Sequence, residues 1–427
     1  MKKVYNPKKE DWPQLLKRPT QTVSDIENTV NTIFAEVQDA GDAVLMKYTN
    51  KFDRVNLDDM LVSANEIREA SSLVTSELKN AIALAKKNIE AFHRAQKTKK
   101  VQVETAPGVL CWQEKRPIQK VGLYIPGGSA PLFSTILMLA IPANIAGCQE
   151  IVLCSPPNNQ GKIPAAILYT AKLCGITQIF KLGGIQAIAG MTFGTESIPK
   201  VYKIFGPGNQ YVTVAKQIAT KHGIAIDMPA GPSELLVMAD DSANASFVAS
   251  DLLSQAEHGA DSQVILVSTS KALIAAVEQE VEKQIMVLPR KAIAIKAIAN
   301  SKLIYFEKSQ AAINLINEYG PEHFILCVAD EGDYLDQLMN AGSVFVGNYT
   351  PESAGDYASG TNHTLPTNGY AKQYSGVNLD SFMKSMTFQK ITPEGILGIG
   401  KAIELMAEAE GLQAHKNAVT LRLDSLN

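Results

Sequence analysis

The first hundred residues carry the apolar spacing of helices. Apolar residues are spaced alternately four and three positions apart, at Leu78, Ile82, Ala85, Ile89 and Phe92. This spacing predicts one face of a long amphipathic helix. Ser63 and Glu66 form the S-x-x-E pattern of a capping box, which marks the start of an earlier helix. His93 lies beside the apolar face without acid–base partners nearby in sequence, so we expect it to be a surface or packing residue rather than a catalytic one.

From residue 120 the pattern changes to short apolar runs bounded by Gly and Pro, which are typical of buried parallel strands. The first series of runs is 121–125, 151–154, 179–182 and 201–205, and the second is 235–239, 264–268, 303–306, 324–328 and 344–346. Helical segments separate the runs. This alternation predicts an α/β protein with two doubly wound, mainly parallel sheets. The repetition suggests an old duplication, although no letter-by-letter repeat is visible.

The domain organisation predicted from these changes has four parts. The chain becomes rich in Gly, Ser, Thr and Asn from Pro351, and a last helix over 395–410 leads to a short tail. We expect a helical N-terminal region over 1–118, α/β domains over 119–234 and 235–350, and a C-terminal loop and helical tail over 351–427.

Composition narrows the class of protein. The chain has 427 residues with 40 basic and 43 acidic side chains, a net charge of −3, which argues against nucleic acid as a partner. The polar start shows no signal peptide. The most apolar stretch, 132–148, is shorter than the ~20 residues of a membrane span. Five scattered cysteines without a CxxC pair indicate reduced thiols. These features predict a soluble, cytoplasmic protein that binds no membrane.

Three glycine turns follow strands of the first series: Gly127-Gly128, Gly183-Gly184 and Gly206-Pro207-Gly208. A strand, a tight turn and a helix N-terminus together present free backbone N–H groups to a phosphate. No turn has the G-x-G-x-x-G pattern, and the strand over 151–154 does not end in the acidic residue that usually binds a ribose. The same turns are also expected where Gly merely supplies a positive φ.

A candidate cation site lies near the end of a predicted helix. Gln255 and His258 are three positions apart, so both side chains share one helix face and could meet one cation. Zinc takes His nitrogen readily and Gln oxygen occasionally. Asp356 and His415 are available as further ligands in later polar clusters. Alternatively, His258 is simply a histidine favoured by the helix dipole near a C-terminus.

A candidate acid–base pair, Glu322-His323, lies at a Gly-Pro turn that enters a strand. Two such neighbours at a strand end are well placed for proton transfer. A solvated Glu beside a His is the alternative.

These residues belong to motifs through which the sequence resembles the histidinol dehydrogenase family over nearly the whole chain. The most specific motifs are VGLYIPGGSAPLFSTILML at 121–139, IFGPGN at 204–209, IDMPAGPSE at 226–234, QAEHG at 255–259, GPEHF at 320–324 and GDYASGTNH at 355–363. The family's fold implies two incomplete Rossmann-like domains with small helical extensions, in an intertwined homodimer whose site takes residues from both chains.

The resemblance also implies roles for individual residues. The zinc ligands would be Gln255, His258, Asp356 and His415, one ion per subunit, and the catalytic pair Glu322 and His323. The NAD contacts would be Tyr124, Gln186 and Asn209, each beside one glycine turn. The substrate contacts would be Ser233, Glu410, His323, the zinc ligands and, as a further one, His363.

The activity implied is oxidation of L-histidinol to L-histidine through L-histidinal with two NAD, the last steps of histidine biosynthesis. A His323 with an ordinary pKa near 6.5 would suit the general base, and Glu322 would activate the water that hydrates the aldehyde. Alternatives are a zinc hydrolase with the same ligands, a solute-binding protein with paired lobes, and a thiohemiacetal on Cys154.

Overall fold

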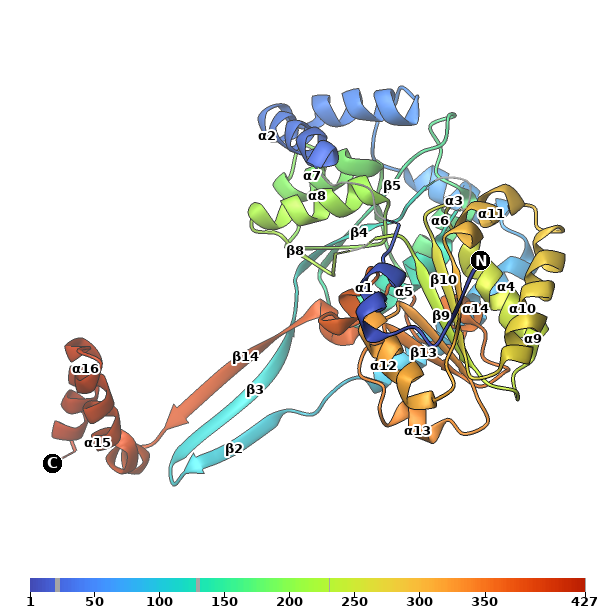
Figure 1. Cartoon of the computed structure of the whole chain (residues 1–427). Coiled ribbons are helices and arrows are strands. Elements are labelled where there is room, and N and C mark those ends of the chain that lie inside the picture. Colours follow the sequence, from blue (N-terminus) through green and yellow to red (C-terminus); the bar gives the residue numbers. More distant parts are fainter. Residues whose placement is uncertain (20–23, 128–130, 230, 427) are drawn as a thin grey trace.

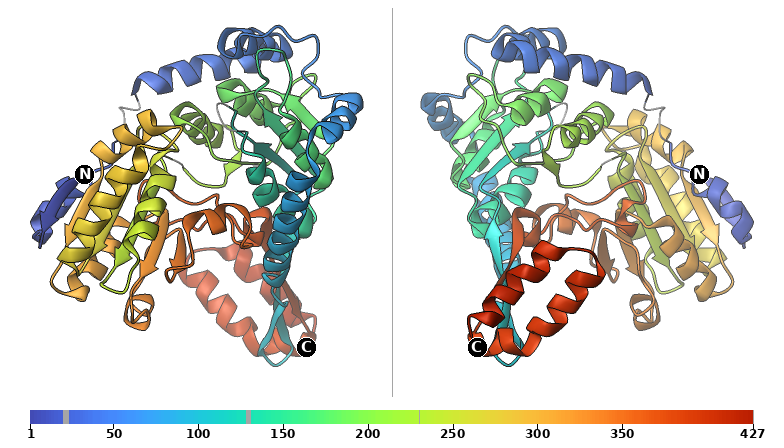
Figure 2. Two further views of the ribbon diagram at one scale, coloured as in Figure 1. Left: turned by 90° about the vertical axis from the view of Figure 1, so that its right-hand side faces the viewer. Right: turned by 90° about the vertical axis from the view of Figure 1, so that its left-hand side faces the viewer.

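The computed structural model describes residues 1–19, 24–127, 131–229 and 231–426. Two parallel sheets with helices on both faces form the body, and an antiparallel arm carries the C-terminal helices away from it (Figure 1). Figure 2 shows the two sheets in separate lobes. The predicted α/β class is confirmed. Within the described ranges, no helix combines the length and the apolar character needed to cross a membrane.

The five-stranded sheet has the order β6-β5-β4-β7-β8, and all its strands are parallel. The first strand in sequence is central: the chain adds two strands on one side of it and then crosses to the other side. The point between β4 and β7 where the direction reverses is where doubly wound sheets usually bind ligands. The bounds are β4 (Lys120–Tyr124), β5 (Glu150–Ser155), β6 (Gln178–Lys181), β7 (Lys203–Phe205) and β8 (Ala225–Ile226).

N-terminal helices complete both faces of this sheet. One face is covered by α5 (Phe133–Ala146), α6 (Ala165–Leu173), α3 (Ala64–Leu73) and α4 (Ser76–Ala95). The other is covered by α7 (Gly184–Phe193), α8 (Gln210–Lys221) and α2 (Ser24–Asp53). The predicted capping box is confirmed, because Glu66 N–H donates to Ser63 Oγ and Ser63 N–H donates to Glu66. His93 is buried with Nδ1 2.9 Å from the carbonyl oxygen of Ile89, as expected of a packing residue.

The six-stranded sheet is also entirely parallel and has the order β1-β11-β10-β9-β12-β13. Apart from the edge strand β1, this is the strand order of the first sheet, as expected if the two series share an origin. The bounds are β1 (Lys2–Tyr5), β9 (Glu234–Ala239), β10 (Gln263–Ser268), β11 (Lys302–Tyr305), β12 (His323–Cys327) and β13 (Ser343–Val346).

Helices cover this sheet on both faces as well. The sequence analysis missed β1, whose backbone pairs with the distant strand β11. One face carries α9 (Ala245–Ala256), α10 (Lys271–Ile285) and α11 (Lys291–Ala299), and the other α1 (Trp12–Leu15), α12 (Ser309–Tyr319) and α13 (Gly332–Leu335).

The arm was not predicted. β14 pairs antiparallel with β3, and β3 with β2, and the two last helices pack against each other at its tip (Figure 1). Phe382 anchors the base of the arm by stacking on Phe205 with ring centroids 4.0 Å apart. The short tail that we expected is itself a helix. The bounds are β2 (Val101–Ala106), β3 (Val109–Pro117), β14 (Met383–Ile391), α15 (Pro393–Ala409) and α16 (Gln413–Asp424), with α14 (Glu352–Tyr357) and 3-10 turns at Lys9–Asp11, Tyr370–Lys372 and Leu379–Phe382.

Candidate active site

The predicted acid–base pair lies at the amino end of the six-stranded sheet. His323 is the first residue of β12, and the adjacent central strand β9 begins with Glu234. The backbone N–H of Glu234 donates to Glu322 Oε2 at 3.0 Å, and its carbonyl oxygen lies 3.3 Å from His323 Nδ1. Both side chains of the pair are buried. The sheet backbone therefore fixes an acid and a base side by side, which excludes the solvated pair.

Three carboxylates surround the His323 ring. Nδ1 lies 3.6 Å from Glu322 and 3.7 Å from Glu352, and Nε2 lies 3.7 Å from Asp356 Oδ1. Burial acts to lower the pKa of His323, but these negative charges outweigh it and raise the pKa to about 10. Burial also raises the pKa of Glu322 to about 7. The sequence analysis expected an ordinary pKa for His323. That expectation is wrong when only protein groups surround the ring, because the carboxylates favour the imidazolium form.

A cluster of possible metal ligands adjoins this pair. One ligand atom each from His258, Glu352 and Asp356 lies within 4.8 Å of the others. His258 follows the C-terminal end of α9, where the helix dipole favours a cation. On the last turn of α9, Gln255 is fully buried, and neither of its amide atoms has a hydrogen-bond partner among the described residues. Because an unpaired buried amide is unfavourable, this side chain fits a ligand donor. Imidazole nitrogen with carboxylate and amide oxygens suits zinc.

Glu352 is the member of the cluster that the sequence analysis missed. It opens α14, is 1% exposed, and accepts a hydrogen bond from Ser254 Oγ at 3.2 Å. Its other carboxylate oxygen has no hydrogen-bond partner in the described part of the chain, and burial raises its pKa to about 8. Glu352 and Asp356 are four positions apart and share one helix face. That spacing after Pro351 was the signal that could have revealed it.

Two predicted substrate contacts lie near the cluster. His363 holds the segment of Asp356, because its Nδ1 lies 2.9 Å from the Asp356 carbonyl oxygen and its Nε2 3.0 Å from Thr135 Oγ1. Ser233 directly precedes β9 and is partly buried. His363 thus contacts the segment that carries Asp356, and Ser233 precedes Glu234, whose backbone contacts the acid–base pair.

The remaining two predicted residues are not brought to the cluster by this chain. Glu410 and His415 are exposed; Glu410 lies between α15 and α16, and His415 is in α16. These two helices pack on each other and on the arm strands, at the tip of the arm (Figure 1). Three of the four predicted metal ligands thus lie in the body, and the fourth projects away from it.

A buried polar network supports the pair from behind, and nothing in the sequence pattern predicted it. The Glu234 carboxylate is paired with Arg18, whose Nη2 donates at 2.8 Å. The Tyr319 hydroxyl lies 3.2 Å from Glu234 Oε2 and 2.9 Å from Gln263 Oε1. Because the backbone of Glu234 contacts both catalytic candidates, this network fixes their position.

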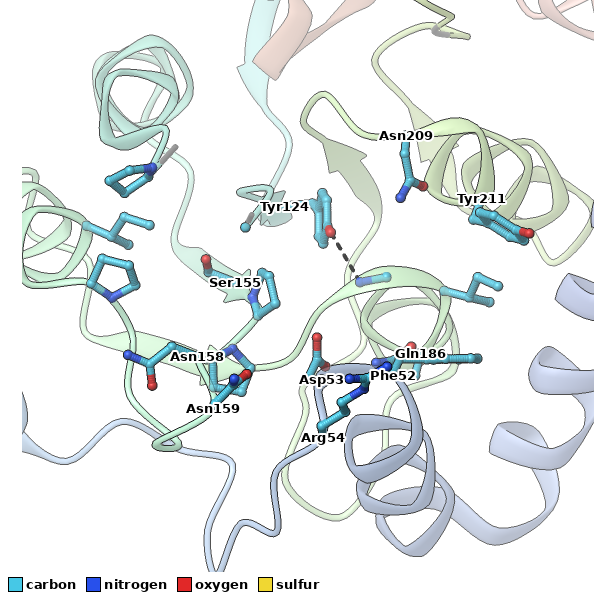
Figure 3. A pocket seen from close by; sticks show the side chains of 18 of the residues that line it. Phe52, Asp53, Arg54, Tyr124, Ser155, Asn158, Asn159, Gln186, Asn209 and Tyr211 are labelled. Carbon is cyan, nitrogen blue, oxygen red and sulfur yellow. Dashed lines mark hydrogen bonds between the residues drawn. The ribbon is translucent and has the colours of Figure 1, made fainter. Parts of the chain in front are cut away.

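A second site lies at the carboxyl end of the five-stranded sheet, where a pocket of about 920 Å³ opens (Figure 3). Tyr124, Gln186 and Asn209, the three predicted NAD contacts, all line it. Tyr124 ends β4 and its hydroxyl accepts the N–H of Gly184 at 3.1 Å. Asn209 caps α8 by accepting the N–H of Val212 at 3.1 Å. Two helix N-termini thus meet at the pocket, an arrangement that favours a phosphate group.

The glycine turn beside Asn209 is held by a buried ion pair. Lys216 Nζ donates to the Gly206 carbonyl at 2.8 Å and pairs with Asp227, which accepts the N–H of Gly206 at 2.8 Å. Gly206 has φ +131°, and a Cβ there would lie 2.1 Å from the Tyr124 carbonyl oxygen, so only glycine fits. Gly127 lines the pocket, whereas Gly128 of the first turn lies outside the described residues.

Cys154 does not suit the thiohemiacetal alternative. Its side chain is fully buried in β5, and burial raises the pKa of the thiol well above its usual value. Since the thiolate is the nucleophile, this cysteine is unreactive in the fold.

Comparison with known proteins shows which family the sequence and the fold resemble. The model of the family described as "Histidinol dehydrogenase" matches residues 16–423. Histidinol dehydrogenase of Bacteroides thetaiotaomicron is 58% identical over 426 residues, covering 100% of both chains. That of Escherichia coli K12 is 53% identical over 420 residues, covering 98% of this chain and 96% of that one. A crystal structure of histidinol dehydrogenase from Elizabethkingia anophelis matches with a TM-score of 0.98 and 57% identity, covering 100% of this chain and 99% of the other.

Proposed function

The chain belongs to the histidinol dehydrogenase family, and from this premise we propose that it oxidises L-histidinol to L-histidine through L-histidinal, with two NAD and a zinc site shared between two copies of the chain. The observation that carries the proposal is the buried Glu322–His323 pair beside two of the expected zinc ligands, His258 and Asp356. A third expected ligand, Gln255, is buried without a partner among the described residues on the helix turn before His258. The comparisons give no support to the alternative of a zinc hydrolase.

The shared site explains the placement of the arm. Gln255, His258 and Asp356 of one chain would hold the zinc, and His415 of a second copy would complete the set. Both His415 and Glu410 are exposed on the helical pair that packs against the arm strands. A closed two-fold dimer in which each arm reaches the other body would contain two complete sites. In the same geometry, Glu410 would pair with the substrate ammonium group.

In the first oxidation, His323 would accept the hydroxyl proton of histidinol while hydride leaves the carbon. The carboxylates around the ring favour imidazolium once this proton has arrived. A zinc ion, when bound, would supply positive charge that orients the substrate nitrogen atoms and offsets these carboxylates, leaving His323 neutral before the reaction. Ser233 and His363 border the space that the substrate would occupy.

In the second oxidation, Glu322 would take a proton from the water that adds to histidinal, while His323 would return the proton gained in the first step to the carbonyl oxygen and become neutral again. A pKa of about 7 suits this role, because a group with a pKa close to the working pH can both accept and release a proton. The gem-diol then loses a proton to His323 and a hydride, which yields the carboxylic acid. The contact with the Glu234 N–H keeps the Glu322 carboxylate in place throughout.

NAD, when bound, would accept the hydride in each step. Its phosphates would lie at the N-termini of α7 and α8, with Tyr124, Gln186 and Asn209 as contacts. Gln186 supports this assignment, because it is 1% exposed and both its amide atoms lack partners among the described residues.

The direct test is to add L-histidinol and NAD to the purified protein and follow NADH absorbance, with zinc measured by elemental analysis. Two NADH should form per histidine, a chelator should abolish turnover, and added zinc should restore it. Manganese or cobalt should also support activity, because a site without thiolates is not strongly selective for zinc. Full turnover in protein shown to be metal-free would contradict the zinc assignment.

A further inference from the structure

The cofactor pocket is lined by two adjacent charged residues, Asp53 and Arg54, that neither the acid–base site nor the predicted NAD contacts use, and Asp53 is the acid of the two. Asp53 is the last residue of α2 and lines the pocket opposite Tyr124 (Figure 3). It comes from a part of the chain about seventy positions before the first strand of this sheet, since β4 begins at Lys120. The strand that usually supplies an acidic residue to a nucleotide, β5, ends here in Ser155.

Asp53 has no partner that explains its position. Its Oδ2 is buried without a hydrogen bond, and no ion pair of this carboxylate is found among the described residues. It also lies at the C-terminal end of a helix, where the dipole disfavours a negative charge. Arg54, the next residue, lines the same pocket with φ +58°, a strained conformation for a side-chain-bearing residue that occurs preferentially at functional sites. A charge kept in such a place is expected to serve a ligand.

The groups around Asp53 define the chemistry of that ligand. Gln186 and the Ser155 hydroxyl are likewise buried without partners in the described chain, and both line the pocket. The Tyr124 oxygen already accepts the Gly184 N–H, so its own proton is available for donation. An acceptor-only carboxylate among groups that both donate and accept suits a vicinal diol, whose two hydroxyls each donate one hydrogen bond.

We propose that Asp53 accepts hydrogen bonds from the adenosine ribose hydroxyls of NAD and thereby disfavours NADP. A 2′-phosphate would bring two negative charges to the carboxylate and remove one donor, so the same residue both binds one dinucleotide and repels the other. The inference rests on the proposed NAD pocket. It assigns a specificity residue that replaces, from α2, the acid missing at the end of β5.

The test measures dinucleotide binding without turnover, by fluorescence titration of the zinc-loaded protein with NADH and with NADPH. Asp53→Asn keeps the size of the side chain and removes its charge. NADH affinity should fall about 10- to 100-fold, as for the loss of a charge-assisted hydrogen bond. NADPH affinity should stay the same or rise, so the NADH preference should shrink by at least about tenfold. Asp58→Asn, an exposed acid five positions on, should change neither affinity.

Each other outcome overturns the assignment. An equal loss for both dinucleotides would place Asp53 at another part of the cofactor, and unchanged affinities would remove it from the contact set. If the unaltered protein bound no NADH, the proposed function itself would fail, which is a different result. A misfolded variant is recognised by its thermal midpoint: Asp53→Asn should not melt below the unaltered protein, because it removes an unpaired buried charge.

Discussion

The two parallel sheets share one strand order, yet they place their candidate chemistry at opposite ends. The five-stranded sheet presents its pocket at the carboxyl ends of its strands, where α7 and α8 begin. The six-stranded sheet presents the acid–base pair at the amino end of β12, close to where α9 stops. Helix N-termini favour phosphates and helix C-termini favour cations. The same topology therefore offers an anion site at one end and a metal site at the other.

The two ends also differ in how their charges are balanced. At the amino end of the six-stranded sheet, His323 is surrounded by Glu322, Glu352 and Asp356, so every charge has a neighbour of opposite sign or a possible shared cation. At the carboxyl end of the five-stranded sheet, Asp53 forms no ion pair among the described residues, although Arg54 lines the same pocket. The first site should therefore respond to substitution through its reaction chemistry, and the second mainly through its affinity for a ligand.

The largest effect is expected at Glu322. Glu322→Gln keeps the hydrogen bond to the Glu234 N–H but removes the proton acceptor. Oxidation of supplied histidinal should fall about 10²- to 10⁴-fold, the usual loss for a general acid–base group, whereas oxidation of histidinol to histidinal should suffer less. Single-turnover NADH formation with each substrate measures the two steps. Equal losses in both would contradict the division of roles between Glu322 and His323.

The second prediction concerns the arm, where one ligand projects away from the body. Glu322→Ala and His415→Ala are each expected to be inactive, but when the two are unfolded and refolded together, mixed dimers should contain one site with both defects and one with neither. Random pairing gives about half mixed dimers, so activity should recover to roughly a quarter of the unaltered level. If mass spectrometry showed mixed dimers and no activity returned, His415 would belong to the site of its own chain.

The sequence analysis predicted some parts of the fold and of the two sites but missed others. The strand and helix series were visible because buried parallel strands are continuous apolar runs. The motif residues were found, but Glu352, Asp53 and the Arg18–Glu234 pair were not, because each reaches its site through tertiary packing over a long sequence separation. The strands β1, β2, β3 and β14 were missed for a related reason. Their residues are largely exposed or half-buried and form no continuous apolar run, and their pairing partners lie far along the chain or in the arm itself.

The third prediction tests the support of the cofactor pocket. Lys216→Met leaves Asp227 buried without its cation, which should lower the free energy of unfolding by about 3–5 kcal/mol and weaken NADH binding through the loosened turn at Gly206. Thermal unfolding and NADH titration measure the two effects. Lys221→Met, at the exposed end of the same helix, loses only a surface pair with Glu27 and should cost less than about 1 kcal/mol. Similar losses for both lysines would show that the Lys216–Asp227 pair does not hold the turn at Gly206.

Adding Asp227→Asn to Lys216→Met separates the effect of the unpaired Asp227 charge from the effect of losing the lysine contact with the Gly206 turn. The double substitution removes the unpaired carboxylate, so it should regain part of the lost stability. NADH affinity should remain reduced, because the Gly206 carbonyl still lacks the lysine donor. Full recovery of affinity would show that the buried charge alone, and not the held turn, affects the pocket.

The smallest effect concerns the unpaired charge of Asp53 and its dependence on pH. Burial raises the pKa of Asp53 to about 6 in the folded protein, from 3.8 for an unperturbed carboxyl. Because the folded pKa is the higher one, the carboxylate destabilises the fold: the penalty is absent below pH 3.8, grows as the pH rises towards 6, and is complete above it. The full shift corresponds to about 3 kcal/mol, but the pocket is open to water, so we expect about 1 kcal/mol.

Near pH 4, Asp53→Asn and the unaltered protein should have the same thermal midpoint, because in the folded state both carry a neutral side chain at this position. Asp53→Asn should melt about 1–2 °C higher at pH 7.5, a small shift because the chain is long. Asp58→Asn supplies the matched control, since it removes an exposed charge from the same segment and should show no such pH dependence. A stabilisation of Asp53→Asn that is equal at both pH values would mean that the carboxylate is not the source of strain. A lower midpoint at pH 7.5 would instead show that Asp53 has a structural partner. The contrast between the balanced charges around His323 in the six-stranded sheet and an unpaired Asp53 beside the five-stranded sheet would then be wrong.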